Sequence, residues 1–254
     1  MSTSPVRLVS VIVPAYNPGE YFLRTIQSIC SQTYRDIEII IVDDASSEGF
    51  RHFFQTIEAL DSRIQLHRLS KNGGGGAARN YGLNLVSGTF VAFCDSDDLW
   101  PSHKLAHQIS FLELTGEPMC HCDMICIDLS GKFLRSRISP DFVGLNEFLR
   151  TTALYCSSAV VRADAIESSR FGELAARHPF KFWCSMLKRG HVSYRVPSAD
   201  FFYTVRDGSV SSNRAKTFLY TLFAYVFYSG GAFRGLHALL YRVVYGLRNR
   251  AFRT

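Results

Sequence analysis

The sequence predicts an α/β protein with a mostly parallel β-sheet that helices cover on both faces. Short runs of apolar and β-branched residues alternate with segments of helical periodicity from residue 8 to residue 115. These runs are apolar throughout, which is typical of strands buried on both faces. Three of the runs end in polar residues, and α/β proteins place their chemistry at the carboxyl ends of such strands.

Local signals define the individual elements. The first apolar run, 8–13, ends at Pro14, and Asn17 is the expected N-cap of the helix that follows. Pro101 suits the first turn of a later helix. The expected strands are 8–13, 37–42, 64–69 and 90–94, and the expected helices are 19–32, 47–60, 76–87 and 101–115.

The pattern becomes a mixture of strands and helices after residue 115, and we expect it to extend the same sheet. Apolar runs predict strands at 119–129, 155–161 and 192–196, and helical periodicity predicts helices at 145–153 and 180–189. Two further helices are expected at 214–229 and 232–250, on either side of a Ser-Gly-Gly turn.

Length and composition limit the class of protein. The 254 residues suffice for one large domain, or for one domain with a small appendage. With 47% hydrophobic and 20% charged residues, the chain is neither a disordered polyelectrolyte nor a low-complexity protein. The apolar run 218–228 is too short for a transmembrane helix, and the N-terminal run lacks the length and cleavage site of a signal peptide. We therefore expect a cytoplasmic protein.

Basic residues are concentrated at the C-terminus. The net charge is +6, and residues 208–254 contain seven Lys or Arg residues and no Asp or Glu. The tail, 214–254, alternates these cations with aromatic residues, which is typical of segments that lie on an anionic membrane surface. A helical pair packed on the core with solvated arginines, or nucleic-acid binding by charge alone, would have the same composition. We expect the membrane surface and no nucleic acid, because no recognition motif is present.

Three carboxylates follow the strand expected at 90–94. Asp95, Asp97 and Asp98 repel one another, and each raises the pKa of its neighbours. A divalent cation relieves this repulsion, and Mg²⁺ commonly bridges carboxylates to substrate phosphates. An acidic loop that stabilises the N-terminus of the helix at 101–115 would give the same pattern.

Four consecutive glycines, 73–76, precede the helix expected at 76–87. Glycine lets backbone N–H groups approach a ligand closely, and a helix N-terminus favours anions. Arg79 adds a charge for a diphosphate or a carboxylate. The alternative is a flexible surface turn, and the Gly-Lys-Ser/Thr of a Walker loop does not follow.

The seven cysteines are predicted to be free thiols, because an odd number is scattered over a cytoplasmic chain. Cys120, Cys122, Met124 and Cys126 occur at every second position and would share one face of a strand. Buried cysteine packs as a small hydrophobe, and a tetrahedral zinc site is hard to close along one strand. We therefore favour packing over zinc for these residues.

Taken together, four segments resemble the family 2 glycosyltransferases, which are nucleotide-sugar-dependent enzymes of the GT-A fold. These segments are 10–17, 32–46, 72–82 and 93–100, and the later residues Trp183, Gly190, Tyr203 and 209–212 also fit. The resemblance covers roughly 8–213 and is strongest to bacterial enzymes that build cell-surface polysaccharides, including teichuronic-acid and O-antigen types. It implies a GT-A-like, Rossmann-related sheet with flanking helices, followed by the helical tail.

The resemblance implies a donor site at the strand ends. Pro14, Tyr16 and Asn17 would line the pocket for the nucleotide base, and Asp44 would hydrogen-bond to the base. Arg79 would lie beside the donor.

The resemblance also implies a metal-binding D-x-D motif in Asp95-Ser96-Asp97. Asp97 would be the direct ligand of Mg²⁺ or Mn²⁺, Asp95 would assist it, and Asp95 and Ser96 would also contact the nucleotide sugar. The metal would offset the charge on the departing diphosphate. The acceptor hydroxyl would attack the anomeric carbon in line and invert it, with a carboxylate taking the proton.

The chain departs from the family pattern at this carboxylate. The family usually has a Glu-Asp pair five and four residues before the tryptophan that corresponds to Trp183, where this chain has His178 and Pro179. Three explanations remain open. His178 serves as the base, since an ordinary imidazole has a pKa near 6.5; a carboxylate elsewhere, such as Glu173, takes this role; or the protein binds a nucleotide sugar and catalyses poorly or not at all.

The resulting expectation is a glycosyltransferase domain over 1–213, with a nucleotide-sugar half (1–115) and an acceptor half (116–213), and the tail 214–254. We expect transfer from a UDP-sugar to a surface-glycan or lipid-linked acceptor, at the inner face of the cell membrane. The alternative is a non-catalytic member that binds a nucleotide sugar or a partner enzyme. A nucleotidyltransferase is disfavoured, because its Gly-rich loop would follow the first strand, where this chain has Pro-Ala-Tyr-Asn-Pro-Gly.

Overall fold

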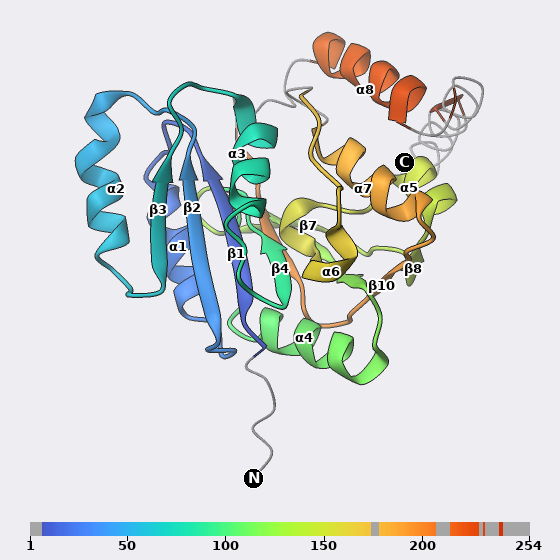
Figure 1. Cartoon of the computed structure of the whole chain (residues 1–254), viewed down its shortest axis with the longest axis horizontal. Helices are drawn as coiled ribbons and strands as arrows, with labels where there is room; N and C mark the ends of the chain where they lie inside the picture. Colours follow the sequence, from blue (N-terminus) through green and yellow to red (C-terminus); the bar gives the residue numbers. More distant parts are fainter. Residues whose placement is uncertain (1–6, 174–177, 207–213, 229–230, 232–238, 241–254) are drawn as a thin grey trace.

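The computed structural model describes residues 7–173, 178–206, 214–228, 231 and 239–240 (Figure 1). Within these residues, the central sheet has eight strands in the order β3-β2-β1-β4-β9-β5-β10-β8. Its first half consists of the parallel strands β1 (Val9–Ala15), β2 (Ile37–Asp43), β3 (Ile64–Arg68) and β4 (Phe90–Phe93). The α/β fold with a mostly parallel sheet is thus confirmed.

The second half of the central sheet is mixed. It consists of β5 (Met119–His121), β8 (Phe142–Val143), β9 (Val160–Arg162) and β10 (Ser193–Arg195). Strand β9 runs antiparallel to both β4 and β5, β10 runs parallel to β5, and β8 runs antiparallel to β10. The later elements therefore extend the first sheet, as predicted.

Helices cover both faces of the central sheet because its strands are apolar on both sides. Along β1, Val11 and Val13 face one hydrophobic cluster, and Ile12 faces the other. The first cluster includes residues of α1 (Tyr21–Cys30), α2 (Arg51–Glu58, after a 3₁₀ turn at Glu48–Phe50) and α4 (Lys104–Thr115). The second cluster includes residues of α3 (Gly74–Leu83), α5 (Leu145–Thr151), α6 (Ala163–Ile166) and α7 (His178–Lys188).

A second, three-stranded sheet was not predicted. It consists of β6 (Met124–Ile127), β7 (Phe133–Arg137) and β11 (Phe201–Thr204), in the order β11-β6-β7. The strand expected at 119–129 is therefore wrong as one element, because the chain leaves the central sheet after β5. Asp123 marks this change of sheet: its carboxylate accepts a bond from the Ser139 N–H (2.7 Å) and pairs with Arg195 (3.1 Å).

Three smaller expectations also differ from the structure. The helix expected at 101–115 is α4, which begins at Lys104, so Pro101 lies before the helix and not in its first turn. The strand expected at 155–161 is a 3₁₀ turn (Cys156–Ser158) followed by β9. Asn17 is not a helix N-cap: α1 begins at Tyr21 after Glu20, and Asn17 takes a positive φ of 41° in the loop after β1. The cysteines at 120, 122 and 126 lie buried with Met124 in one hydrophobic cluster, as the packing prediction required.

The tail begins as a helix that packs on the body of the protein. The helix expected at 214–229 is α8 (Arg214–Tyr228), which lies against α7 in Figure 1. Ala224 and Tyr225 are fully buried in the second cluster, whereas Phe223 and Phe227 are exposed. Most of the helix expected at 232–250 lies outside the described residues. No helix in the described part of the chain is both long and apolar enough to cross a membrane.

Candidate active site

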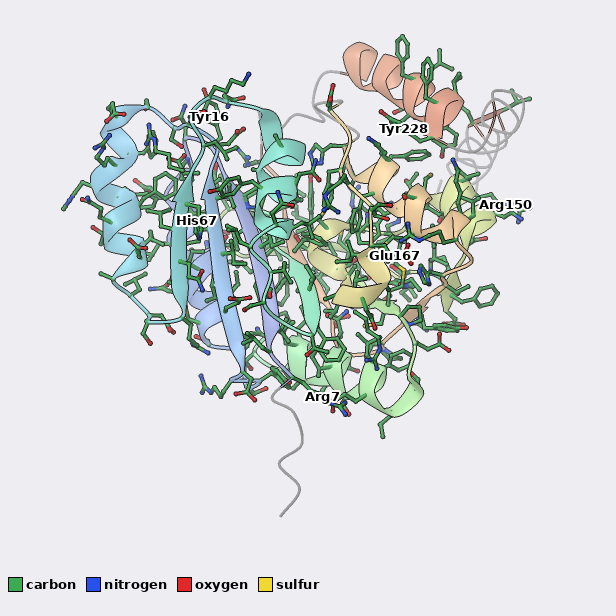
Figure 2. The ribbon with its side chains drawn as sticks, viewed as in Figure 1. Arg7, Tyr16, His67, Arg150, Glu167 and Tyr228 are labelled. Carbon is green, nitrogen blue, oxygen red and sulfur yellow. The ribbon has the colours of Figure 1, made fainter. Side chains whose placement is uncertain are left out.

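The predicted site residues lie at one edge of the central sheet, where β1, β2 and β4 end. Figure 2 shows Tyr16, just after β1, at this edge and Arg7, just before β1, at the opposite edge. The loops after the strands are tied together, since the backbone N–H of Asp44 donates to the carbonyl of Ala15 (2.8 Å). The parallel register therefore brings residues from three loops to one place.

The loop after β1 presents Tyr16 to solvent and is fixed by Asn17. Pro14 is buried and pairs with Val42 of β2, whereas the Tyr16 side chain is exposed. The backbone N–H of Asn17 donates to the Ser46 hydroxyl (2.8 Å), and its side-chain Oδ1 accepts from the backbone N–H of Ser47 (2.8 Å). Asn17 thus joins the loops after β1 and β2.

Asp44 binds the glycine-rich segment rather than standing free. Its side chain is buried, and its two carboxylate oxygens accept hydrogen bonds from the backbone N–H groups of Gly73 (2.8 Å) and Gly74 (2.7 Å). Gly74 has a positive φ of 81°, a conformation that favours glycine. The anion at these N–H groups is therefore a carboxylate of the chain itself.

The other two glycines of this segment allow α3 to approach α7 closely. A Cβ on Gly76 would lie 2.3 Å from the Gly172 carbonyl oxygen and 2.9 Å from the Cβ of His178. A Cβ on Gly75 would lie 2.9 Å from Arg79 Nη1. The four glycines thus serve two purposes, hydrogen bonding to Asp44 and close packing, and neither requires a Walker loop.

Arg79 is held in place from several sides. Its side chain is 5% exposed, it pairs with Asp95, and its Nη1 donates to the Gly75 carbonyl oxygen (2.9 Å). The guanidinium carbon lies 5.5 Å from the centre of the Phe171 ring. Arg79 thus supplies a fixed positive charge beside the acidic loop.

The acidic loop after β4 carries two carboxylates that are accessible to a ligand. The side chain of Asp95 is 39% exposed and that of Asp97 is 20% exposed. Burial, followed by the charge of Asp95, raises the pKa of Asp97, and Arg206 opposes this by donating from Nε to Asp97 Oδ2 (2.7 Å). Ser96 fixes the loop through its carbonyl oxygen, which accepts from the Thr25 hydroxyl (3.2 Å).

Ser157 positions the acidic loop through two hydrogen bonds. Its hydroxyl accepts from the backbone N–H of Asp95 (3.0 Å) and donates to the Asp98 carboxylate (2.5 Å). Asp98 is buried, and burial, followed by the charges of Asp95 and Asp97, raises its pKa well above its usual range. Neither Ser157 nor Arg206 was predicted, because no local pattern marks a residue that reaches the loop from so far along the chain.

His178 begins α7 and faces Arg79. Its Nδ1 lies 3.4 Å from Arg79 Nη1, and because a guanidinium only donates, this nitrogen is the acceptor. Burial, followed by the charge of Arg79, lowers the pKa of His178 to about 3. The imidazole is therefore neutral near pH 7, and its described contacts favour support of Arg79.

A cavity of about 150 Å³ lies beside the acidic loop. Pro179 lines it, whereas His178 does not, so of the two residues at the position where a family carboxylate was expected, Pro179 is the one that faces this space. Aromatic side chains make up half of the wall. The lining residues are Asp95, Asp98, Phe148, Thr152, Leu154, Tyr155, Cys156, Pro179, Phe180, Trp183, Phe201 and Tyr203.

The donor set at the acidic loop fits a divalent cation that is shared with a substrate. The described residues contain no group of three or more His, Cys, Asp or Glu side chains arranged to hold a metal ion by themselves. Asp95 and Asp97 are two partly exposed carboxylates, and the charge of Asp95 helps to raise the pKa of Asp97. Mg²⁺ is often bound by one or two carboxylates together with substrate phosphates.

Comparison with known proteins decides the family. The family model described as "Glycosyl transferase family 2" matches residues 10–169, which is more than half of the chain. The chain belongs to glycosyltransferase family 2. A relative named for teichuronic acid biosynthesis, the glycosyltransferase TuaG of Bacillus subtilis (strain 168), is 32% identical over 225 residues, covering 86% of this chain and 87% of the relative.

A second relative of this family 2 member has a named reaction. It is the UDP-Glc:alpha-D-GlcNAc-diphosphoundecaprenol beta-1,3-glucosyltransferase WfaP of Escherichia coli. The two proteins are 30% identical over 211 residues, covering 83% of this chain and 82% of WfaP.

Solved structures show the same fold. Residues 1–349 of S. aureus TarS, in complex with UDP-GlcNAc, align with a TM-score of 0.69 over 92% of this chain and 71% of that one, at 19% identity. The mannosyltransferase PcManGT of Pyrobaculum calidifontis, in complex with GDP-Man and Mn²⁺, aligns with a TM-score of 0.66 over 87% of this chain and 63% of that one, at 18% identity. At this level of identity, both support the GT-A fold alone.

Proposed function

We propose that this protein is an inverting glycosyltransferase that moves a sugar from a UDP-sugar to a surface-glycan or lipid-linked acceptor. The observation that carries this proposal is the meeting of Asp95, Asp97 and Arg79 at the edge of the sheet, next to the aromatic cavity. Two carboxylates and a fixed guanidinium suit a diphosphate with its cation, and the cavity provides a place for a second substrate.

The donor would lie across the ends of β1, β2 and β4. Pro14, Tyr16 and Asn17 would receive the nucleotide base, and of these Tyr16 and Asn17 are exposed. Asp44 holds the glycine-rich segment with both oxygens, and each oxygen keeps a further lone pair with which to accept a bond from the base. Arg79 would balance the charge of the diphosphate from its fixed position.

Asp97, assisted by Asp95, would hold the Mg²⁺ or Mn²⁺ ion, and Ser96 would contact the nucleotide sugar. When bound, such a cation offsets the negative charge that builds on the departing diphosphate. Arg79, the bond that the Asp95 N–H donates to Ser157, and the bond that Thr25 donates to Ser96 orient the loop that carries these carboxylates. The site is therefore preorganised by residues of the chain itself.

The acceptor sugar would enter the aromatic cavity. Sugar-sized ligands bind in concave sites with aromatic walls and a few placed polar groups, and Asp95 and Thr152 are such groups here. The named activity of WfaP supports a lipid-linked diphosphate sugar as the acceptor class. The surface of α8, with its exposed Phe223 and Phe227, would place the cavity near the inner face of the membrane.

Pro179 supports a second candidate function, a member that binds the nucleotide sugar or a partner enzyme but transfers sugar slowly or not at all. Proline cannot accept the proton of the acceptor hydroxyl. His178 is a weak candidate for this step, since its pKa is about 3 and its Nδ1 faces Arg79. Glu173, an exposed residue just after Gly172, is the other candidate that the sequence offered.

Calorimetric titration tests the donor half of the proposal. The protein is titrated with UDP and with GDP, each with and without Mn²⁺, and the Asp97→Asn variant is the control. We expect UDP to bind more tightly with Mn²⁺ than without it, and Asp97→Asn to lose that gain. Binding of neither nucleotide would contradict the proposal, and preference for GDP would contradict the choice of donor.

A further inference from the structure

Asp95 and Asp97, the two accessible carboxylates of the acidic loop, are each paired with an arginine, but the two arginines are held very differently. Arg79 is buried between α3 and the Phe171 ring and also bonds to the Gly75 carbonyl. Arg206 follows β11, and its side chain is 32% exposed. Its Nε donates a hydrogen bond to Asp97, its guanidinium carbon lies 5.0 Å from the centre of the Tyr21 ring, and its charge also interacts with Tyr203.

The Arg206–Asp97 pair occupies a position that a metal ion would need. Arg206 Nε lies 2.7 Å from Asp97 Oδ2, so a cationic group already neutralises the carboxylate that we propose as the metal ligand. A divalent cation and a guanidinium cannot both sit in contact with the same oxygen without strong repulsion. A cation that binds at Asp97 Oδ2 must therefore displace Arg206 from this oxygen.

Arg206 is the partner that can leave at low cost. The Arg206 side chain is partly exposed, and an ion pair whose cation can return to water contributes little net stability. By contrast, freeing Arg79 would leave a buried guanidinium without its carboxylate, which costs much more. Replacement of Arg206 by a metal ion at Asp97 is thus energetically accessible, whereas Arg79 should remain paired with Asp95.

We propose that Arg206 holds the place of the metal ion at Asp97 in the free protein and, when the metal binds, turns to contact the donor diphosphate. This inference rests on the proposed function, because it takes Asp97 as the metal ligand. The position of Arg206 favours the second contact, because a guanidinium released from Asp97 would stay close to a diphosphate held at the acidic loop. Its planar donors match phosphate oxygens well.

The exchange predicts opposite effects of one substitution in two conditions. Without nucleotide, Arg206→Gln removes the competitor of the metal, so Mn²⁺ should bind about fivefold more tightly than to the wild type. With saturating Mn²⁺, the same variant lacks the contact to the diphosphate, so UDP should bind at least about fivefold more weakly. The coupling between Mn²⁺ and UDP should therefore be smaller in Arg206→Gln than in the wild type.

Electron paramagnetic resonance measures the affinity for Mn²⁺ without nucleotide. Calorimetry measures the affinity for UDP in saturating Mn²⁺. Arg7→Gln is the matched control, because Arg7 is similarly exposed, forms a single ion pair with Glu113 and lies at the opposite edge of the sheet (Figure 2). It should leave both affinities unchanged. Arg206→Lys keeps the charge and should bind Mn²⁺ as the wild type does.

Each contrary result has a distinct meaning. Unchanged or weaker Mn²⁺ binding by Arg206→Gln without nucleotide would overturn the proposed competition between Arg206 and the metal. An equal gain in Mn²⁺ affinity in Arg7→Gln would show that the effect of Arg206→Gln comes only from the change in net charge, and this too would overturn the competition. Unchanged UDP binding by Arg206→Gln in saturating Mn²⁺ would overturn the contact to the diphosphate. If Mn²⁺ bound to none of these proteins even with UDP present, the proposed metal site itself would fail.

Discussion

The ring of Tyr225 in α8 lies 4.8 Å from the ring of Phe180 in α7, and Phe180 lines the cavity beside the acidic loop. Tyr225 is fully buried, and its hydroxyl donates to the Leu149 carbonyl at the end of α5 (2.6 Å). The first helix of the tail therefore supports the wall of the proposed acceptor cavity. Deleting 214–254 would disturb this wall as well as any membrane contact, so single substitutions are the better test.

Substituting Tyr225 should separate its packing from its hydrogen bond. We expect Tyr225→Ala to lower the free energy of unfolding by about 3 kcal/mol or more, because it leaves a large void in a packed cluster. Tyr225→Phe keeps the ring and should cost only about 1 kcal/mol. Urea denaturation measures both changes, and equal, small effects would mean that α8 does not pack as described.

The close approach of α3 and α7 predicts an unusual sensitivity at Gly76. Gly76→Ala should destabilise the protein by about 1–3 kcal/mol, because the added Cβ would overlap the Gly172 carbonyl and crowd His178. Gly49→Ala is the matched control, since a Cβ there meets nothing within 4 Å and should be close to neutral. Thermal unfolding of the two variants side by side would reveal the difference, and equal melting temperatures would speak against this packing.

The depressed pKa of His178 predicts a specific loss of stability in acid. In the folded protein this pKa is about 3, below its ordinary value of 6.5, so the unfolded chain binds more protons between these values. Stability linked to His178 is therefore present at pH 7 and lost as the pH falls towards 3.

His178→Gln isolates this contribution from those of other groups. Between pH 7 and pH 5, the wild type should lose about 1–2 kcal/mol more free energy of unfolding than the variant. Denaturant titrations at both pH values measure the difference. Parallel losses in the two proteins would show that His178 is not neutral and buried as described.

The exposed aromatic pair on α8 predicts binding to anionic membranes. The rings of Phe223 and Phe227 are stacked 5.9 Å apart and are 50% and 67% exposed as residues. Phe227→Ser should weaken binding to vesicles that contain anionic lipid by about tenfold, because a phenylalanine side chain gains about 1.5–3 kcal/mol when it is buried. Phe133→Ser is the control, since Phe133 in β7 is similarly exposed (61%). If both variants bound vesicles equally well, the α8 surface would not be the contact.

The grouping of the acidic residues at one edge of the sheet could be predicted, because the carboxyl ends of parallel strands lie at the same edge. Apolar runs identify parallel strands, and such strands bring their carboxyl ends together, so Asp44, Asp95 and Asp97 were predictable at one edge from the sequence alone. Their exact partners were not. Arg206 meets Asp97 across 109 residues of chain and Ser157 meets Asp95 across 62, and no periodicity in a single sequence encodes such contacts.

The glycine-rich segment was recognised in the sequence, but the reason for each glycine was only partly predicted. Backbone N–H groups and an anion were expected there, and the structure supplies the anion from Asp44. Glycine at 75 is explained by Arg79 and His178, and glycine at 76 by the Gly172 carbonyl and His178. The position of His178 depends on how α7 packs. The second sheet was missed for a similar reason, because its strands are short and β7 is exposed along its whole length.

Transfer of sugar by the full chain tests the central claim most directly. The wild type and Pro179→Asp are incubated with UDP-glucose, Mn²⁺ and a synthetic N-acetylglucosamine diphosphate lipid, and the glycosylated lipid and released UDP are quantified together. We predict product from the wild type in step with UDP release, and faster transfer by Pro179→Asp, because it restores a carboxylate at the cavity wall. Product from Pro179→Asp alone would show that the natural protein is a non-catalytic member. If neither protein gave product with UDP-glucose or any other UDP-sugar, the account of this protein as a UDP-sugar transferase would be contradicted.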